Sequence, residues 1–190
     1  DARGCPGFKL YSPTGVEQVQ LNLLGTHNVA NALAAAAAAH ALGVSLFGIK
    51  TGLEAVQPVK GRAVAQLTAA GLRIIDDTYN ANPTSMCAAI DILAAFSGRT
   101  VLVLGDIGEL GEWAEQGHRE VGAYAADKVS ALYAVGPMMA HAVSEFGPQA
   151  RHFANQADLI MALRAEQQTN TTILIKGSRS AAMENVVAAL

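Results

Sequence analysis

The segment TVLVLGDIGELG, residues 100–111, joins an unbroken apolar run to a polar turn that contains three glycines. A run of Val and Leu without polar alternation is typical of a strand in a sheet that is covered on both faces. Glycines at the end of such a strand let the backbone approach a ligand closely. The segment therefore predicts a buried strand that ends in a polar loop.

The same alternation continues through residues 62–190. We predict strands at 63–67, 72–76, 100–104, 129–134, 151–153 and 171–175, and helices at 83–96, 116–126, 137–146, 156–167 and from 180 to the end. The first two strands are expected to form a hairpin around residues 69–71. Helices of about ten residues or more between buried strands indicate parallel pairing. The predicted fold class is α/β, with a Rossmann-like, doubly wound, mostly parallel sheet that begins with a hairpin strand.

Residues 1–60 have a different pattern. We expect strands at 8–11 and 16–24, an alanine-rich helix that follows residues 25–28 and ends at Gly43, and a second helix that Ser45 caps and that runs to about Val56. The segment QPVKG, residues 57–61, interrupts the helical pattern. We therefore predict two domains, residues 1–60 and residues 61–190.

Two glycine-rich segments resemble nucleotide motifs only in part. In GVSLFGIKT, residues 43–51, Ile49 separates the second glycine from the lysine, and the segment lies between two predicted helices. A phosphate-binding P-loop joins a strand to a helix, so we interpret residues 43–51 as a connection between helices. The glycines of residues 105–111 do not have the G-x-G-x-x-G spacing of a dinucleotide-binding loop.

Composition excludes several classes of function. The net charge of −3 gives no basic surface for a nucleic acid, and the longest apolar run, Ala32–Ala39, is too short to span a bilayer. Cys5 and Cys87 have no metal-ligand spacing, which indicates reduced thiols in a cytoplasmic protein. We expect no metal site, no membrane insertion and no signal peptide. The remaining histidines of interest are interpreted as surface or core residues and not as zinc ligands: His118, His141 and His152.

Polar groups follow several predicted strands at their carboxyl ends, where open α/β sheets bind ligands. The segments concerned are 76–83, 105–111, 136–137 and 176–180. Each also has a structural interpretation. Asn82 before Pro83 is an ideal helix start, Asp76 and Asp77 can be turn carboxylates, and residues 176–179 can form a solvated loop. Together they predict a polar binding edge.

Five motifs, in order, resemble those of the Mur ligases, the ATP-dependent amide-forming ligases of bacterial peptidoglycan synthesis. They are GTHNVAN at 25–31, GR at 61–62, DTYNANP at 77–83, GDIGELG at 105–111, and KGSR at 176–179 followed by Met183-Glu184. The third is similar to the signature of the branch that adds D-Ala-D-Ala. The fourth has Ile107 where that branch has methionine. The resemblance covers essentially the whole chain.

The resemblance implies that residues 1–60 are the end of a central ATPase domain and that residues 61–190 are the C-terminal domain. Its substrates would be ATP, a UDP-N-acetylmuramoyl-tripeptide and D-Ala-D-Ala, joined through an acyl phosphate. The implied ATP-binding residues are His27, Asn28, Asn31, Arg62 and Asp77. The implied substrate-binding residues are Tyr79, Asn80, Asn82, Asp106, Glu109, Lys176, Ser178 and Arg179, of which Lys176 and Arg179 are catalytic candidates.

The resemblance also places the P-loop and the Mg²⁺ ligands upstream of Asp1, which fits an internal fragment. We expect a monomer in the bacterial cytoplasm that is inactive without those parts. Two alternatives stay open. A free-standing nucleotide-binding Rossmann-like module would carry G-x-G-x-x-G after its first strand, and a non-catalytic interaction domain would have no ligand edge.

Overall fold

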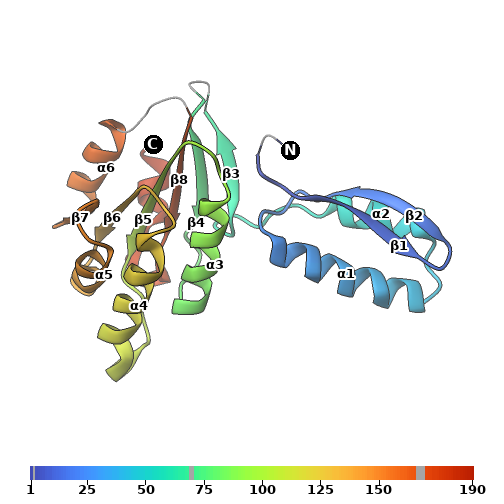
Figure 1. The fold of residues 1–190 in the computed structure, drawn as a ribbon, viewed down its shortest axis with the longest axis horizontal. Coiled ribbons are helices and arrows are strands. Elements are labelled where there is room, and N and C mark those ends of the chain that lie inside the picture. The colour runs from blue at the N-terminus through green and yellow to red at the C-terminus, as the bar shows by residue number, and fades with distance from the viewer. Residues whose placement is uncertain (2, 69–70, 166–169) are drawn as a thin grey trace. The chain divides into compact units, whose positions relative to one another are not determined.

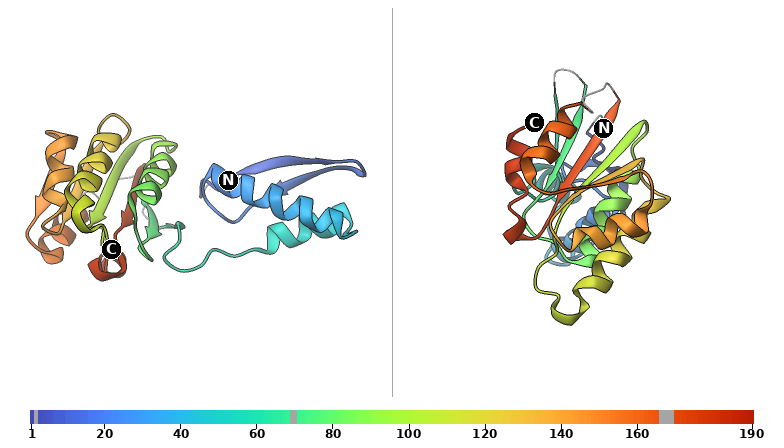
Figure 2. Two further views of the ribbon diagram at one scale, coloured as in Figure 1. Left: turned by 90° about the horizontal axis from the view of Figure 1, so that it is seen from below. Right: turned by 90° about the vertical axis from the view of Figure 1, so that its left-hand side faces the viewer.

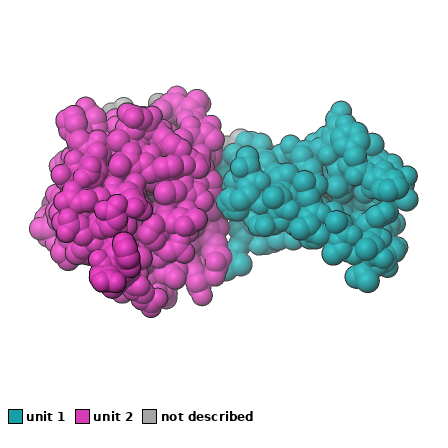
Figure 3. All heavy atoms as spheres, turned by 60° about the horizontal axis from the view of Figure 1, so that its bottom comes forward, with its two compact units in different colours: residues 1–59 teal, residues 60–190 magenta. Residues whose placement is uncertain are grey.

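The structure is a computed structural model that describes residues 1, 3–68, 71–165 and 170–190. The chain divides into two compact units, Asp1–Val59 and Lys60–Leu190, which Figure 3 colours separately. Each unit has its own buried apolar cluster, so each is described by itself.

The first unit packs two helices against a two-stranded hairpin. Strands β1 (Gly7–Ser12) and β2 (Gly15–Gln20) are antiparallel, and the helices are α1 (Thr26–Ala41) and α2 (Leu46–Ala55). The second strand is shorter than the predicted 16–24. Polar alternation stops at Leu21, and Asn22 turns the chain toward α2 by donating its amide to the carbonyl oxygen of Glu54 at 2.7 Å.

The connection between α1 and α2 confirms that residues 43–51 are no P-loop. Gly43 has φ +81°, and its N–H donates to the carbonyl oxygen of His40 at 2.9 Å, which ends α1. The Ser45 hydroxyl then accepts the N–H of Gly48 at 3.1 Å and caps α2. The segment therefore joins two helices, as its sequence predicted.

The second unit is built on a six-stranded sheet with the order β3-β4-β8-β5-β6-β7. Only the β3–β4 pair is antiparallel, so the predicted doubly wound, mostly parallel α/β class is confirmed (Figure 1). Of the predicted hairpin turn at 69–71, residues 69 and 70 lie outside the described residues, as do residues 166 and 167 of the predicted helix 156–167. The strands are β3 (Val64–Leu67), β4 (Arg73–Asp77), β5 (Arg99–Gly105), β6 (Ala131–Val135), β7 (Ala150–Phe153) and β8 (Thr171–Lys176).

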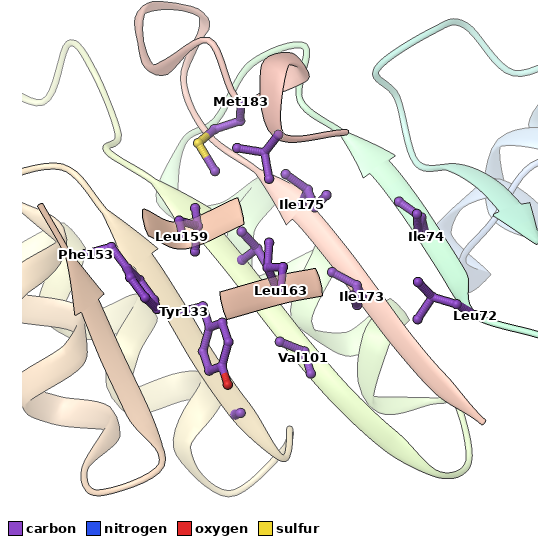
Figure 4. Packing of buried hydrophobic residues seen from close by; sticks show 13 residues of the cluster. Leu72, Ile74, Val101, Tyr133, Phe153, Leu159, Leu163, Ile173, Ile175 and Met183 are labelled. Carbon is purple, nitrogen blue, oxygen red and sulfur yellow. The ribbon is translucent and has the colours of Figure 1, made fainter. Parts of the chain in front are cut away.

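Helices cover both faces of this sheet (Figure 2). One face carries α3 (Pro83–Ala94), α4 (Ala114–Ala126) and α5 (Met139–Phe146), and the other carries α6 (Gln156–Ala165) and α7 (Glu184–Ala188). In Figure 4, Leu159 and Leu163 of α6 lie over apolar side chains of the strands. Alternate strand residues point to opposite faces, so continuous apolar strands fill both cores.

The predicted helix from residue 180 to the end is interrupted. A 3₁₀ turn, Arg179–Ala181, precedes α7, and a second such turn, Gly111–Trp113, precedes α4. Ala182 has left-handed backbone with φ +48°, which an α-helix cannot contain.

No helix within the described residues is long and apolar enough to cross a membrane.

The last strand of the chain lies in the middle of the sheet. The chain passes from β4 through α3 to β5 and leaves a gap that β8 fills. Parallel register then brings Asp77 of β4 and Leu104 of β5 level with Lys176 of β8. Three loops that are distant in sequence therefore begin side by side at the carboxyl edge.

Candidate functional site

The site is the carboxyl edge formed by the loops after β4, β8 and β5. These loops carry the segments 77–83, 176–180 and 105–111 that the sequence singled out. Gly177 lies so close to β5 that a Cβ built on it would be 3.3 Å from the Cα of Gly105. The glycines thus permit the loops after β5 and β8 to approach each other, whereas larger residues would separate them.

A buried ion pair forms the centre of this edge. The Lys176 ammonium donates to Asp77 Oδ2 at 2.7 Å and to the carbonyl oxygen of Asn80 at 3.0 Å. The other oxygen of Asp77 accepts the N–H of Ala63 at 3.0 Å. Only 4% of the Lys176 side chain is exposed, against 17% for Asp77. The pair therefore joins the loops after β4 and β8 to the start of β3.

Burial raises the pKa of the Asp77 carboxyl, and the neighbouring Lys176 ammonium acts in the opposite direction. An ionised carboxylate has about four lone-pair sites, so Asp77 keeps acceptor capacity beyond its two contacts. Lys176 has three N–H donors and uses two of them. Both residues hold the loops together and can still present polar atoms to a ligand.

Arg62 and Tyr79 form the exposed part of the edge. Gly61 has φ +76°, and its carbonyl oxygen accepts the N–H of Tyr79 at 2.9 Å. The Arg62 guanidinium carbon then lies 4.0 Å from the centre of the Tyr79 ring. Such stacking orders the cation without taking its N–H donors. The arrangement offers an anion a positioned, solvent-accessible guanidinium.

Two residues, one near the end of β4 and one in the loop that follows it, have the structural roles that their sequence also allowed. Asp76 is buried, and its Oδ1 accepts the N–H and the hydroxyl of Thr78 at 3.2 and 2.7 Å, as in a turn. Asn82 accepts the N–H of Ser85 at 2.8 Å, and Ser85 accepts the N–H of Asn82 at 3.0 Å. This capping box starts α3, so the Asn82 side-chain oxygen is already engaged. Asn80 is exposed.

Asp106 connects the loop after β5 to two other elements. Its carboxylate accepts the N–H of Met139, at the start of α5, at 2.9 Å. Its carbonyl oxygen accepts the N–H and the hydroxyl of Ser178 at 3.0 and 2.7 Å. A Cβ at Gly136 would meet the Asp106 carboxylate at 2.4 Å. Asp106 and the buried Ser178 therefore belong to the framework of the edge.

Glu109 and Arg179 project from this framework. Glu109 is exposed, with a left-handed φ of +63°. The Arg179 side chain is 71% exposed and lies 3.3 Å from Glu184 Oε1, an arrangement that leaves donors for another anion. Among the residues that the structure describes, no group of three or more His, Cys, Asp or Glu side chains is placed to hold a metal ion.

The other predicted ATP-binding residues lie in the first unit, on the first turn and a half of α1. Asn28 donates to the carbonyl oxygen of Leu24 at 2.7 Å, and Asn31 donates to Asn28 Oδ1 at 3.2 Å. His27 is exposed beside them. The amide oxygen of Asn31 and the exposed imidazole are available to a ligand. Arg62 and Asp77 belong to the second unit.

Sequence reasoning missed the contribution of His118. The structure buries His118 fully, whereas His141 is half-buried and His152 is exposed. His118 is nevertheless hydrogen-bonded to the N–H of Ile107, inside the loop after β5, at 3.0 Å. Its eleven-residue separation from Ile107 matches no local motif, so no sequence signal identifies the contact.

Comparison with known proteins decides the family. Residues 61–179 match the family model described as "Mur ligase, glutamate ligase domain". The chain belongs to the Mur ligase family. The resemblance found in the five sequence motifs is thereby confirmed.

Relatives of this Mur ligase chain include the UDP-N-acetylmuramoyl-tripeptide–D-alanyl-D-alanine ligase of Escherichia coli. It is 46% identical over 187 residues, which cover 96% of this chain and 41% of the relative. A crystal structure of MurF from Acinetobacter baumannii is 41% identical with a TM-score of 0.87, over 98% of this chain and 42% of that one. The chain thus spans about two fifths of the length of these relatives.

A more distant structure shows the same fold. MurF ligase from Thermotoga maritima, solved in complex with ADP, has a TM-score of 0.82 at 23% identity. The alignment covers 98% of this chain and 43% of that chain. The backbone arrangement is therefore retained when fewer than a quarter of the residues are identical.

Proposed function

We propose that this Mur ligase chain is part of an ATP-dependent enzyme that joins D-Ala-D-Ala to a UDP-N-acetylmuramoyl-tripeptide. The observation that carries the proposal is the convergence of three loops at one sheet edge around the Asp77–Lys176 pair. These loops contain the DTYNANP, GDIGELG and KGSR segments. The relative from Escherichia coli that bears this activity in its name aligns with 96% of the chain, including all three loops.

The proposed reaction has two steps. The carboxylate of the tripeptide takes the γ-phosphoryl group of ATP, which gives an acyl phosphate and ADP. The amine of D-Ala-D-Ala then attacks the carbonyl carbon, and an amide forms as phosphate leaves and the amine loses a proton. Protein groups would accelerate both steps by positioning the reactants and by neutralising phosphate charge.

Residues of this chain would divide those tasks. Arg62, held over Tyr79, would contact the phosphates of ATP. Asp77 would accept a hydrogen bond from the ribose hydroxyls with its remaining lone pairs. The exposed Arg179, with Tyr79 and Asn80, would face the acyl phosphate and the incoming dipeptide. Asn82, Asp106, Ser178 and Lys176 would act mainly by fixing these loops, and Glu109 would border the dipeptide.

The first unit carries the remaining residues that we expect to bind ATP. We propose that residues 1–60 are the end of the central ATPase domain and that residues 61–190 are the C-terminal domain. His27, Asn28 and Asn31 would then lie against the adenine. The Mg²⁺ ligands would lie outside these 190 residues, as the family resemblance implies. The enzyme would be a monomer of the bacterial cytoplasm.

Replacing Arg62 with alanine in the protein that contains this chain is expected to raise the KM for ATP by about tenfold or more, because a charge-assisted phosphate contact is lost. The KM for ATP would be measured from the rate of phosphate release in the presence of both the tripeptide and D-Ala-D-Ala. Arg151→Ala is the matched control. The Arg151 guanidinium also stacks on an aromatic ring, with its carbon 4.9 Å from the centre of the Phe153 ring, but it lies on β7, the edge strand at the opposite end of the sheet from β3. Equal ATP kinetics in both variants would contradict the role of Arg62. Absence of dipeptide-dependent phosphate release in the unmodified protein would contradict the proposed function.

These 190 residues by themselves are expected to form no amide. They contain no G-x-x-x-x-G-K-[ST] loop, and neutralisation of the γ-phosphoryl charge depends on such a loop and on Mg²⁺. The purified chain, incubated with ATP, Mg²⁺, the tripeptide and D-Ala-D-Ala, should release phosphate at the rate of a blank without protein. Turnover above that blank would show that the chain holds the whole catalytic apparatus.

A further inference from the structure

His118 lies beneath the edge as a fully buried histidine on α4. Its Nδ1 lies 2.6 Å from the carbonyl oxygen of Ala114, and its Nε2 accepts the N–H of Ile107 at 3.0 Å. A carbonyl oxygen can only accept, so Nδ1 carries the proton. Because the Ile107 N–H can only donate, Nε2 is unprotonated. The two contacts together select one neutral tautomer.

The contact holds the loop at the residue that follows Asp106. Asp106 is bonded to Met139 at the start of α5 and to Ser178 after β8, and Ile107 is bonded to His118 on α4. Glu109, with its left-handed backbone, comes two residues later. His118 therefore ties α4 to the part of the loop that leads to the exposed Glu109.

We propose that His118 is a positioning residue that fixes the Ile107–Glu109 segment of the loop for the incoming dipeptide. It acts through the single hydrogen bond from Ile107 N to its Nε2 and touches no substrate itself. The inference rests on the proposed function for the identity of the ligand. The hold on the loop follows from the contacts alone.

Two amide substitutions separate this role from a general loss of packing. A glutamine at 118 can place its side-chain oxygen where Nε2 lies and can accept the Ile107 N–H. An asparagine is one methylene shorter, so it can reach the Ala114 carbonyl oxygen but not Ile107. Both remove the ring and both introduce a carboxamide, which makes them a matched pair.

The experiment compares His118→Asn and His118→Gln in the protein that contains this chain. His118→Asn is expected to raise the KM for D-Ala-D-Ala by about tenfold, because the buried Ile107 N–H loses its acceptor, and to change the KM for ATP by less than about twofold. His118→Gln should restore the dipeptide KM to within about threefold of the unmodified protein. Equal kinetic effects of the two variants, or a rise in both KM values together, would overturn the proposal.

Hydrogen exchange of the same two variants measures the protection of the loop amides independently of the reaction. The amide of Ile107 should exchange about tenfold faster in His118→Asn than in His118→Gln. If the unmodified protein forms no amide but this difference is present, the proposed function fails and the hold of His118 on the loop stands. If the ligase is active and the exchange rates of the variants are equal, the positioning role fails by itself.

Discussion

Replacing Lys176 with methionine is expected to lower the free energy of unfolding of the second unit by about 3 kcal/mol and to abolish amide formation. Methionine retains most of the length of the unbranched side chain but removes the ammonium group. Asp77 then remains in a largely buried position without its cation, and the carbonyl oxygen of Asn80 loses its donor. Urea unfolding followed by circular dichroism would measure the loss.

The destabilisation by Lys176→Met should depend on pH in a defined direction. Burial raises the pKa of Asp77, and Lys176 opposes that rise. Without Lys176 the pKa of Asp77 in the folded state lies still further above its unfolded value. The folded variant then holds a proton that the unfolded chain has released, so its stability falls as pH rises through the interval between the two pKa values. The deficit relative to the unmodified protein should therefore shrink in acid.

An exposed ion pair of similar length provides the control. Lys128 lies 2.6 Å from Asp91, and 36% and 53% of their side chains are exposed. Water solvates either partner after the other is removed, so Lys128→Met should cost much less than Lys176→Met. The double variant Asp77→Asn with Lys176→Met should regain part of the lost stability, because the buried charge is gone. Equal losses in the free energy of unfolding for Lys176→Met and Lys128→Met would contradict the expectation that burial makes the Asp77–Lys176 pair more important for stability.

Replacing Gly122 with alanine is the second change with a large expected effect, a loss of about 3 kcal/mol in the free energy of unfolding. Gly122 lies in α4 where that helix meets α5. A Cβ there would be 2.1 Å from the carbonyl oxygen of Ala142 and 2.6 Å from its Cα. These are backbone atoms, so relief requires the two helices to separate. Movement of α5 would also draw Met139 away from Asp106, and we expect weaker binding of D-Ala-D-Ala.

Gly117→Ala, in the same helix, is the matched control. The atoms nearest to its Cβ would be Leu110 Cδ1 at 3.0 Å and Pro83 Cγ at 3.2 Å, both in side chains. Leu110 can yield, and alanine gains up to about 1 kcal/mol in helix propensity over glycine, so the net change should be small. Chemical unfolding of both variants tests the difference. A loss for Gly122→Ala no larger than that for Gly117→Ala would show that the helices separate without cost.

Local signals in the sequence were sufficient for most elements. Periodicity, Ser45, Gly43 and the Asn82-Pro83 pair marked the helices, since caps and turns depend on neighbouring residues. Errors occurred where no local signal marks an end. The strand predicted at 16–24 ends at Gln20, and the helix predicted from 180 is broken at Ala182.

The sequence by itself thus determined the fold class, the two-part pattern, the family motifs and the set of polar loops at the carboxyl edge. Only the tertiary structure decided which loops are neighbours, because strand order depends on packing over the whole sheet. The insertion of β8 between β4 and β5 brings Lys176 to Asp77, 99 residues away in the chain. Only the tertiary structure, too, shows that Asp106 is hydrogen-bonded to Met139 and that His118 is hydrogen-bonded to Ile107. Hydrogen bonds between distant segments leave no periodic pattern in a sequence.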